Sequence, residues 1–166
     1  MERTVNIPKR TERQADEEFA AEIMALEQNL YRIALSMLHQ PALAEDAVAE
    51  AVCKAYASRR RLREREKLKP WLFQILVNQC RTMQRRHGRE VPLETLTVEP
   101  VQREPQSGLW DLVRQLPASQ QSVIVLYYYE GYSVREIAKL LRLKEGTVRV
   151  RMTRGRETLR QWMEEP

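Results

Sequence analysis

The clearest candidates for chemistry lie near the C-terminus, where Arg149, Val150, Thr153 and Arg154 fall on one face of an expected helix. An arginine can donate two hydrogen bonds to a guanine in the DNA major groove, and it can equally hold a phosphate. Val150 and the methyl group of Thr153 could touch a thymine methyl. The spacing leaves open which arginine would read a base, and a solvated basic helix is the alternative.

The residues around this face have the pattern of a helix-turn-helix. Ser133 and Glu136 form a capping box at the start of the first helix. The apolar face of that helix consists of Ile137, Leu140 and Leu141. Val148 and Met152 would turn inward from the second helix, which in this motif enters the major groove. We therefore expect DNA contacts from Lys144, Thr147, Arg149, Val150, Arg151, Thr153, Arg154 and Arg156.

An acidic face is the second candidate surface. Asp46 and Glu50 are four residues apart and share one side of an expected helix. Such a pair suits a basic partner surface, and a solubilising surface is the alternative. The pair could also act in acid–base catalysis, but no nucleophile or metal-ligand pattern accompanies it. The sequence therefore predicts no enzyme activity.

Metal and cofactor chemistry has no support in the sequence. Cys53 and Cys80 are far apart and lack a ligand spacing, and His39 and His87 form no cluster with them. Both cysteines are expected to be reduced. No apolar run of about 18 residues and no signal peptide is visible, which predicts a cytoplasmic protein without membrane insertion.

Basic residues are concentrated in two blocks, although the chain as a whole carries a net charge of only +5. Residues 59–90 have a net charge of +8 and residues 133–160 a net charge of +6, whereas residues 1–50 have a net charge of −5. Two basic blocks with a less basic stretch between them indicate two contacts with a polyanion.

The elements that must position these residues are helices. Apolar residues recur at helical spacing, glycines are few and alternating strand patterns are absent. The pattern predicts helices over 17–38, 42–58, 70–86, 109–116 and 118–129, followed by the helix-turn-helix. We thus expect an all-α chain of two small helical domains, 15–88 and 107–166. A flexible tail (1–14) precedes them, and a proline-rich flexible linker (89–106) joins them.

Taken together, this order of motifs resembles the extracytoplasmic-function group of sigma-70-type bacterial RNA polymerase sigma factors, which have only region 2 and region 4. In region 4 the resemblance is carried by Leu116-Pro117-Ala118-Ser119-Gln120-Gln121, Tyr129-Glu130-Gly131-Tyr132-Ser133, Gly146-Thr147-Val148-Arg149 and Arg154-Gly155-Arg156. In region 2 it is carried by Ala44-Glu45-Asp46-Ala47-Val48-Ala49-Glu50 and Trp71-Leu72-Phe73-Gln74-Ile75. Lys144 stands where the family often has a capping serine, so the second helix should lack a side-chain cap.

The resemblance implies a role for each surface. The helix-turn-helix would read the promoter −35 element, and core RNA polymerase would bind a face containing Glu45, Asp46 and Glu50. Asn78 would help capture an unstacked base, unless it is a buried asparagine bonded to backbone. The −10 element would be gripped by Arg59, Arg60, Arg61, Arg63, Lys67, Lys69, Asn78, Arg85 and Arg86. An anti-sigma protein would hold the chain inactive, and no cofactor is needed.

Two other functions remain open at this point. A stand-alone helix-turn-helix repressor or activator would need a dimer to span two half-sites. Such a protein has no need of an acidic helix followed by a basic strand-gripping segment, and no heptad seam is visible. A protein that mimics a sigma factor without binding DNA is the second, and the arginines of 149–156 argue against it.

Overall fold

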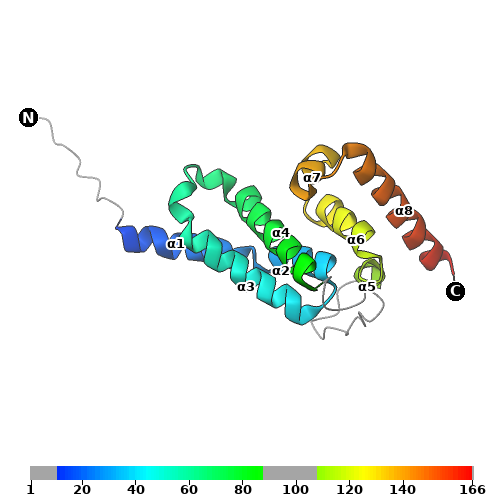
Figure 1. Cartoon of the computed structure of the whole chain (residues 1–166), viewed down its shortest axis with the longest axis horizontal. Coiled ribbons are helices and arrows are strands. Elements are labelled where there is room, and N and C mark those ends of the chain that lie inside the picture. The colour runs from blue at the N-terminus through cyan, green and yellow to red at the C-terminus, as the bar shows by residue number, and fades with distance from the viewer. Residues whose placement is uncertain (1–10, 88–107, 166) are drawn as a thin grey trace, which may run out of the picture.

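A computed structural model describes residues 11–87 and 108–165, and within these ranges the chain forms helices and no strands (Figure 1). The N-terminal domain contains α1 (Glu12–Ala25), α2 (Glu27–Leu38), α3 (Pro41–Ala57) and α4 (Leu68–His87). The C-terminal domain contains α5 (Gly108–Val113), α6 (Ala118–Ile124), the π-helical turn η4 (Val125–Tyr129), α7 (Val134–Leu141) and α8 (Glu145–Glu164). The expected all-α fold of two helical domains is confirmed. The expected linker, 89–106, lies outside the described residues.

The start of the N-terminal domain differs from the sequence prediction in two ways. The first helix begins at Glu12, because Thr11 and Gln14 form a capping box, so residues 12–14 are helical and do not belong to a tail. The helix expected over 17–38 is divided at Leu26, where φ is −98° and ψ is 2°. No glycine or proline marks this break in the sequence.

Helices α2, α3 and α4 form the core of the N-terminal domain. The side of α3 that faces the other two helices carries small residues, and all of them are fully buried: Ala44, Ala47, Ala51 and Ala55. Alanines at this spacing allow the helix backbones to approach closely, and Leu30, Leu72 and Phe73 fill the remaining space. The face of α3 opposite to this stripe is therefore turned to solvent.

Residues 59–67 connect α3 to α4, and we call them the basic connection. They form two short 3₁₀ turns, η1 (Arg59–Arg61) and η2 (Arg65–Lys67), and neither contains a buried residue. Turns of this length make few internal hydrogen bonds. The basic connection must therefore be held in place by its neighbours.

In the C-terminal domain, α8 is fixed by close contact with α6. Gly155 lies on the contact side, where a Cβ atom would come within 3.0 Å of Cγ1 of Ile124. Before α7 the chain turns at Gly131, whose φ of +72° is disfavoured for residues with a side chain. Ser133 and Glu136 then form the predicted capping box.

The two domains also pack against each other, which the sequence did not predict. Helix α2 contacts α6 and η4, and α4 contacts α7. At the centre of this contact the carboxylate of Glu130, whose side chain is 0% exposed, accepts hydrogen bonds from Asn29 (2.8 Å) and Arg32 (3.2 Å). The ammonium group of Lys69 lies 3.8 Å from the same carboxylate. One buried carboxylate thus has three polar partners in the other domain.

Candidate nucleic-acid and polymerase interface

The second helix of the helix-turn-helix, α8, presents the predicted face to solvent. Val148 (0% exposed) and Met152 (3%) pack inward, as predicted. Lys144 precedes the helix and makes no side-chain capping bond. Thr147 and Arg151 are half-buried, and the exposed candidates are Lys144, Arg149, Val150, Thr153, Arg154 and Arg156. Val150 is 49% exposed, which is compatible with contact to an apolar group such as a thymine methyl.

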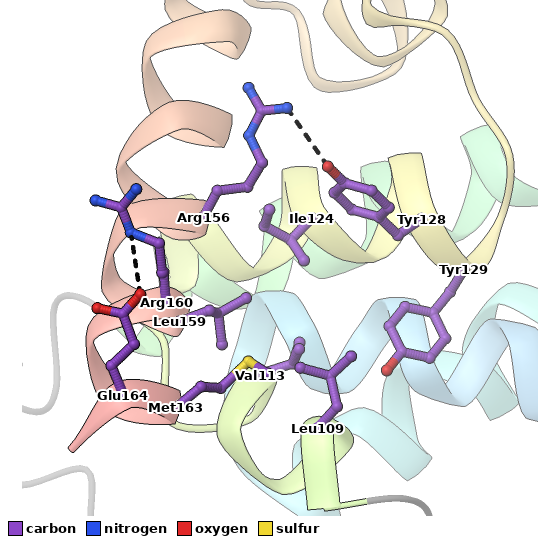
Figure 2. Close-up of a pocket in the computed structure, with 10 residues that line it drawn as sticks. All are labelled: Leu109, Val113, Ile124, Tyr128, Tyr129, Arg156, Leu159, Arg160, Met163 and Glu164. Atoms are coloured by element: carbon purple, nitrogen blue, oxygen red, sulfur yellow. Dashed lines mark hydrogen bonds and ion pairs between the residues drawn. The ribbon is translucent and has the colours of Figure 1, made fainter.

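The arginines of α8 have different surroundings. Nη2 of Arg149 lies 3.3 Å from Glu145 in an exposed pair, which contributes little and is easily exchanged for a DNA contact. Arg156 lies two turns after Arg149 on α8. Its Nη1 donates a hydrogen bond to the hydroxyl of Tyr128 at 3.4 Å (Figure 2). Arg149 thus has an exposed partner on its own helix, whereas the partner of Arg156 is a tyrosine of η4.

An apolar hollow of about 620 Å³ lies beside the C-terminal half of α8. Figure 2 shows it between α5, α6 and α8, with Leu109, Val113, Leu159 and Met163 pointing inward. Leu109 is 45% and Met163 64% exposed. This end of α8 thus offers a surface for an apolar partner, away from the exposed arginines at the start of the helix.

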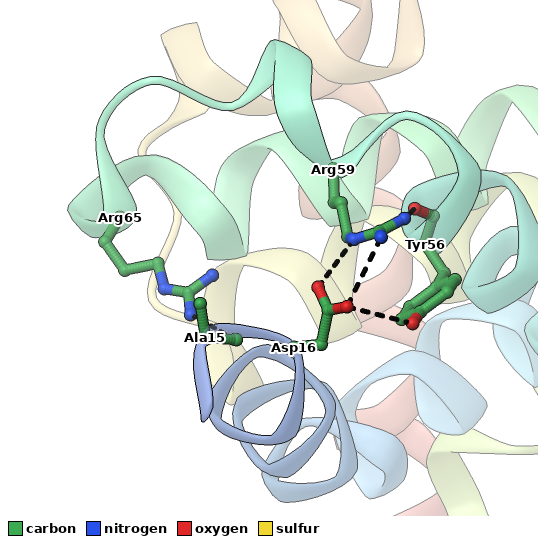
Figure 3. Close-up of polar contacts among 5 residues, drawn as sticks. All are labelled: Ala15, Asp16, Tyr56, Arg59 and Arg65. Carbon is green, nitrogen blue, oxygen red and sulfur yellow. Dashed lines mark hydrogen bonds and ion pairs between the residues drawn. The ribbon is translucent and has the colours of Figure 1, made fainter. Parts of the chain in front are cut away.

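Some candidate −10 residues are exposed, and others are held by carboxylates of the protein. Arg60, Arg61, Arg63 and Lys67 are exposed. Arg59 is half-buried: its Nε donates to Oδ1 of Asp16 at 2.8 Å and its Nη1 to the carbonyl of Tyr56 at 3.0 Å (Figure 3). The hydrogen bond to Asp16 raises the pKa of Arg59.

Asn78 is exposed on α4, which excludes a buried asparagine bonded to backbone. Its Oδ1 accepts a hydrogen bond from Gln74 on the same helix (3.0 Å). Arg85 and Arg86 are exposed in the last turn of α4, where a positive charge is favoured by the helix dipole. Lys69 is half-buried, because it points toward Glu130.

The predicted acidic face is present on α3. Glu45, Asp46 and Glu50 are all exposed, with Asp46 and Glu50 opposite the buried alanine stripe and Glu45 at the lining of an apolar hollow. This hollow of about 630 Å³ runs between α3 and the first two helices, and Met24 at its edge is 72% exposed. Acidic and apolar groups therefore lie together on one open surface.

Comparison with known proteins gives the family. The sigma-70 region 2 family matches residues 23–90, and the sigma-70 region 4 family matches residues 107–159. The chain belongs to the sigma-70 family, in its extracytoplasmic-function (ECF) group. Sigma factors are transcription initiation factors that bind core RNA polymerase and promoter DNA. The alternative of a stand-alone repressor or activator finds no support in these matches.

Individual relatives are similar to this sigma factor at modest identity. The ECF sigma factor SigM of Bacillus subtilis is 28% identical, with 80% of this chain and 86% of that protein covered. The probable sigma factor RfaY of Xanthomonas campestris pv. campestris is 29% identical over 83% of this chain, which spans only 38% of that longer protein. A solved structure, the sigma factor RpoE of Bartonella quintana in complex with the anti-sigma factor NepR, matches with a TM-score of 0.72, 27% identity and coverage of 90% and 98%.

The two described parts of the sigma factor, residues 11–87 and 108–165, have neither a membrane-spanning helix nor a cluster of metal-ligating side chains. No helix there has the length and apolar character needed to cross a membrane. The same residues contain no group of three or more His, Cys, Asp or Glu side chains that could hold a metal ion.

Sequence reasoning missed two sets of residues in this sigma factor. The first is Asp16 and Glu22 on α1, which pair with arginines of the basic connection. The second is Glu130 with its partners across the domain contact. Glu130 stands in one of the motifs that carried the family resemblance, which was the only signal for it.

Proposed function

We propose that this sigma factor directs core RNA polymerase to its promoters by contacting DNA with both domains. Region 2, assigned to residues 15–88, would capture the −10 element, and region 4, assigned to 107–166, would read the −35 element. The observation that supports this best is the pair of exposed basic surfaces on separate domains: the face of α8 with Arg149 and Arg154, and the basic connection with Arg60 and Arg61.

The proposed −10 surface combines strand binding with base capture. The exposed arginines of the basic connection would hold the phosphates of the separated strand. The amide of Asn78 can donate and accept hydrogen bonds, as an extruded base requires. Arg85 and Arg86 would extend the positive surface along α4. The polymerase would supply the active site for RNA synthesis.

Core polymerase would bind the exposed acidic face of α3. Glu45, Asp46 and Glu50 would meet a basic surface, and the neighbouring apolar hollow would add contact area. We further propose that an anti-sigma protein regulates this chain in the cytoplasm. The support is the structural similarity to a sigma factor solved with NepR.

The test is transcription with core polymerase. Purified sigma factor and host core enzyme should give run-off transcripts from a subset of host genomic fragments, and the sigma factor alone should bind the same promoters weakly and with strong salt dependence. Tight binding of the isolated chain to a palindrome as a dimer would overturn the proposal.

A further inference from the structure

The basic connection is fastened to α1 at both ends (Figure 3). At its start, Nε and Nη2 of Arg59 donate to the two carboxylate oxygens of Asp16 at 2.8 and 3.4 Å. Six residues later, Nε of Arg65 lies 3.3 Å from Glu22, and Nη2 of Arg65 donates to the carbonyl of Ala15 (3.3 Å). Two carboxylates of one helix thus hold two arginines of the connection.

Helix α1 is a suitable anchor because its own position is fixed. Phe19 is 2% exposed and packs against Trp71 of α4, with ring centroids 6.5 Å apart. Phe19 also lies under the guanidinium of Arg65, 5.2 Å from the ring centroid, and beside the ring of Tyr56 at 6.4 Å. The ties from Asp16 and Glu22 therefore lead to the core of region 2.

The arginines of the connection fall into two groups. All three nitrogens of the Arg59 guanidinium have partners within the protein. Beside the two bonds to Asp16, Nη1 donates to the carbonyl of Tyr56, and the guanidinium lies 4.3 Å from the centroid of the Tyr56 ring. In contrast, among the residues that the structure describes, no carboxylate lies within ion-pair distance of Arg60, Arg61 or Arg63, and all three are exposed. Only the second group keeps its donors available for phosphates.

We propose that Asp16 and Glu22 are positioning residues for −10 strand capture. Through Arg59 and Arg65 they fix the basic connection so that Arg60, Arg61 and Arg63 face the DNA backbone. This inference rests on the proposed function and changes one assignment within it: Arg59 supports the connection and does not hold DNA.

The physical reason is preorganisation. Neither turn of the connection has a buried residue, and Leu62 between them is only partly buried against the core, so without the ties the connection would be less ordered and would have to be ordered when DNA binds. A competing explanation is that Asp16 and Glu22 mimic phosphates and keep the arginines away from DNA. The two explanations predict opposite signs, because removing a mask strengthens DNA binding and removing a support weakens it.

The experiment uses the full chain with host core polymerase on a promoter selected by run-off transcription, as duplex and with its −10 element held open by mismatched bases. The variants are Asp16→Ala, Arg59→Ala, the double variant and Arg61→Ala. The matched control is Glu17→Ala, which removes a neighbouring carboxylate that pairs with Arg13 on the same helix at 3.1 Å. Asp16→Asn, with almost unchanged shape, serves if the alanine variant folds poorly.

We expect Asp16→Ala and Arg59→Ala each to weaken affinity for the open promoter by about five- to tenfold, with the double variant no worse than either, because they remove one shared interaction. The slope of log affinity against log salt should be unchanged for both, whereas Arg61→Ala should reduce it by about one unit, as expected for a lost phosphate contact. A purely structural defect would not separate these slopes.

Three results would overturn the inference. They are tighter binding by Asp16→Ala, equal behaviour of Asp16→Ala and Glu17→Ala, and additive losses in the double variant. If Arg61→Ala and Asn78→Ala also transcribe like the wild type, the proposed −10 surface itself is wrong, so the two failures are distinguishable.

Discussion

Replacing Glu130 should separate the two domains. The side chain is 0% exposed and accepts hydrogen bonds from Asn29 and Arg32, with Lys69 at 3.8 Å. Charged hydrogen bonds contribute about 1.5–3 kcal/mol each and neutral ones about 1 kcal/mol. Lys69 is 44% exposed, so solvent screens most of its contribution. Arg32 retains its position over the rings of Trp110 (5.7 Å) and Tyr129 (5.1 Å) after the change, which offsets part of the loss.

For Glu130→Ala we therefore expect about 2–3 kcal/mol less stabilisation of the domain contact, or a shift of ~30- to 150-fold toward separated domains, since 1.36 kcal/mol is tenfold. Glu130→Gln keeps the shape and should shift the equilibrium less.

The assay is the distance between a label on Cys53 and one on Met163→Cys, two exposed positions in different domains. Burial raises the pKa of Cys80 to about 12, so this thiol should not compete for the label at neutral pH. Glu157→Gln, an exposed carboxylate on α8, is the matched control. Identical distance distributions for Glu130→Ala and Glu157→Gln would refute the reasoning.

Three further predictions concern DNA, polymerase and pH. Arg149→Ala or Arg154→Ala should cost about 1–3 kcal/mol of promoter binding by the holoenzyme if the side chain contacts a base; titrations that match the wild type at several salt concentrations would remove α8 from −35 recognition. Replacing both Asp46 and Glu50 with Lys should strongly weaken core-polymerase binding through like-charge repulsion, while circular dichroism stays unchanged because both positions are exposed. Burial, together with nearby carboxylates, raises the pKa of Tyr132 to about 12. Its contribution to stability is thus complete below its unfolded pKa of about 10 and is lost as the pH rises from there to 12, so Tyr132→Phe should flatten this part of a pH–denaturation curve.

Local features of the fold were predictable from the sequence, and long-range ones were not. The capping box of Ser133 and Glu136 and the inward face of Val148 and Met152 depend on spacings of three and four residues, which any helix imposes. The acidic face of α3 followed from the same rule.

The contacts that hold the site together follow from tertiary packing. Arg59 and Asp16 are 43 positions apart, and nothing in their spacing selects this partner among the other carboxylates of α1. Asn78 illustrates the same limit, because the sequence left a buried asparagine open beside base capture, and only its exposed position on α4 decides between them. The sequence could therefore nominate the basic connection as a site, but not the residues that fix its shape.

The length of α8 has a mechanical consequence. This single helix carries Val150 near one end and Met163 near the other, and the 13 residue steps from one to the other span about 20 Å at 1.5 Å per step. A rotation of ~10° about Gly155, which lies about 7.5 Å along the helix from Val150, would displace Val150 by ~1.3 Å, enough to stretch a hydrogen bond beyond its usual range. The helix is thus a lever whose pivot is the close contact of Gly155 with Ile124. A partner bound in the hollow beside Met163 would hold the C-terminal half of α8. It would thereby set the angle at which the arginines of the N-terminal half enter the groove.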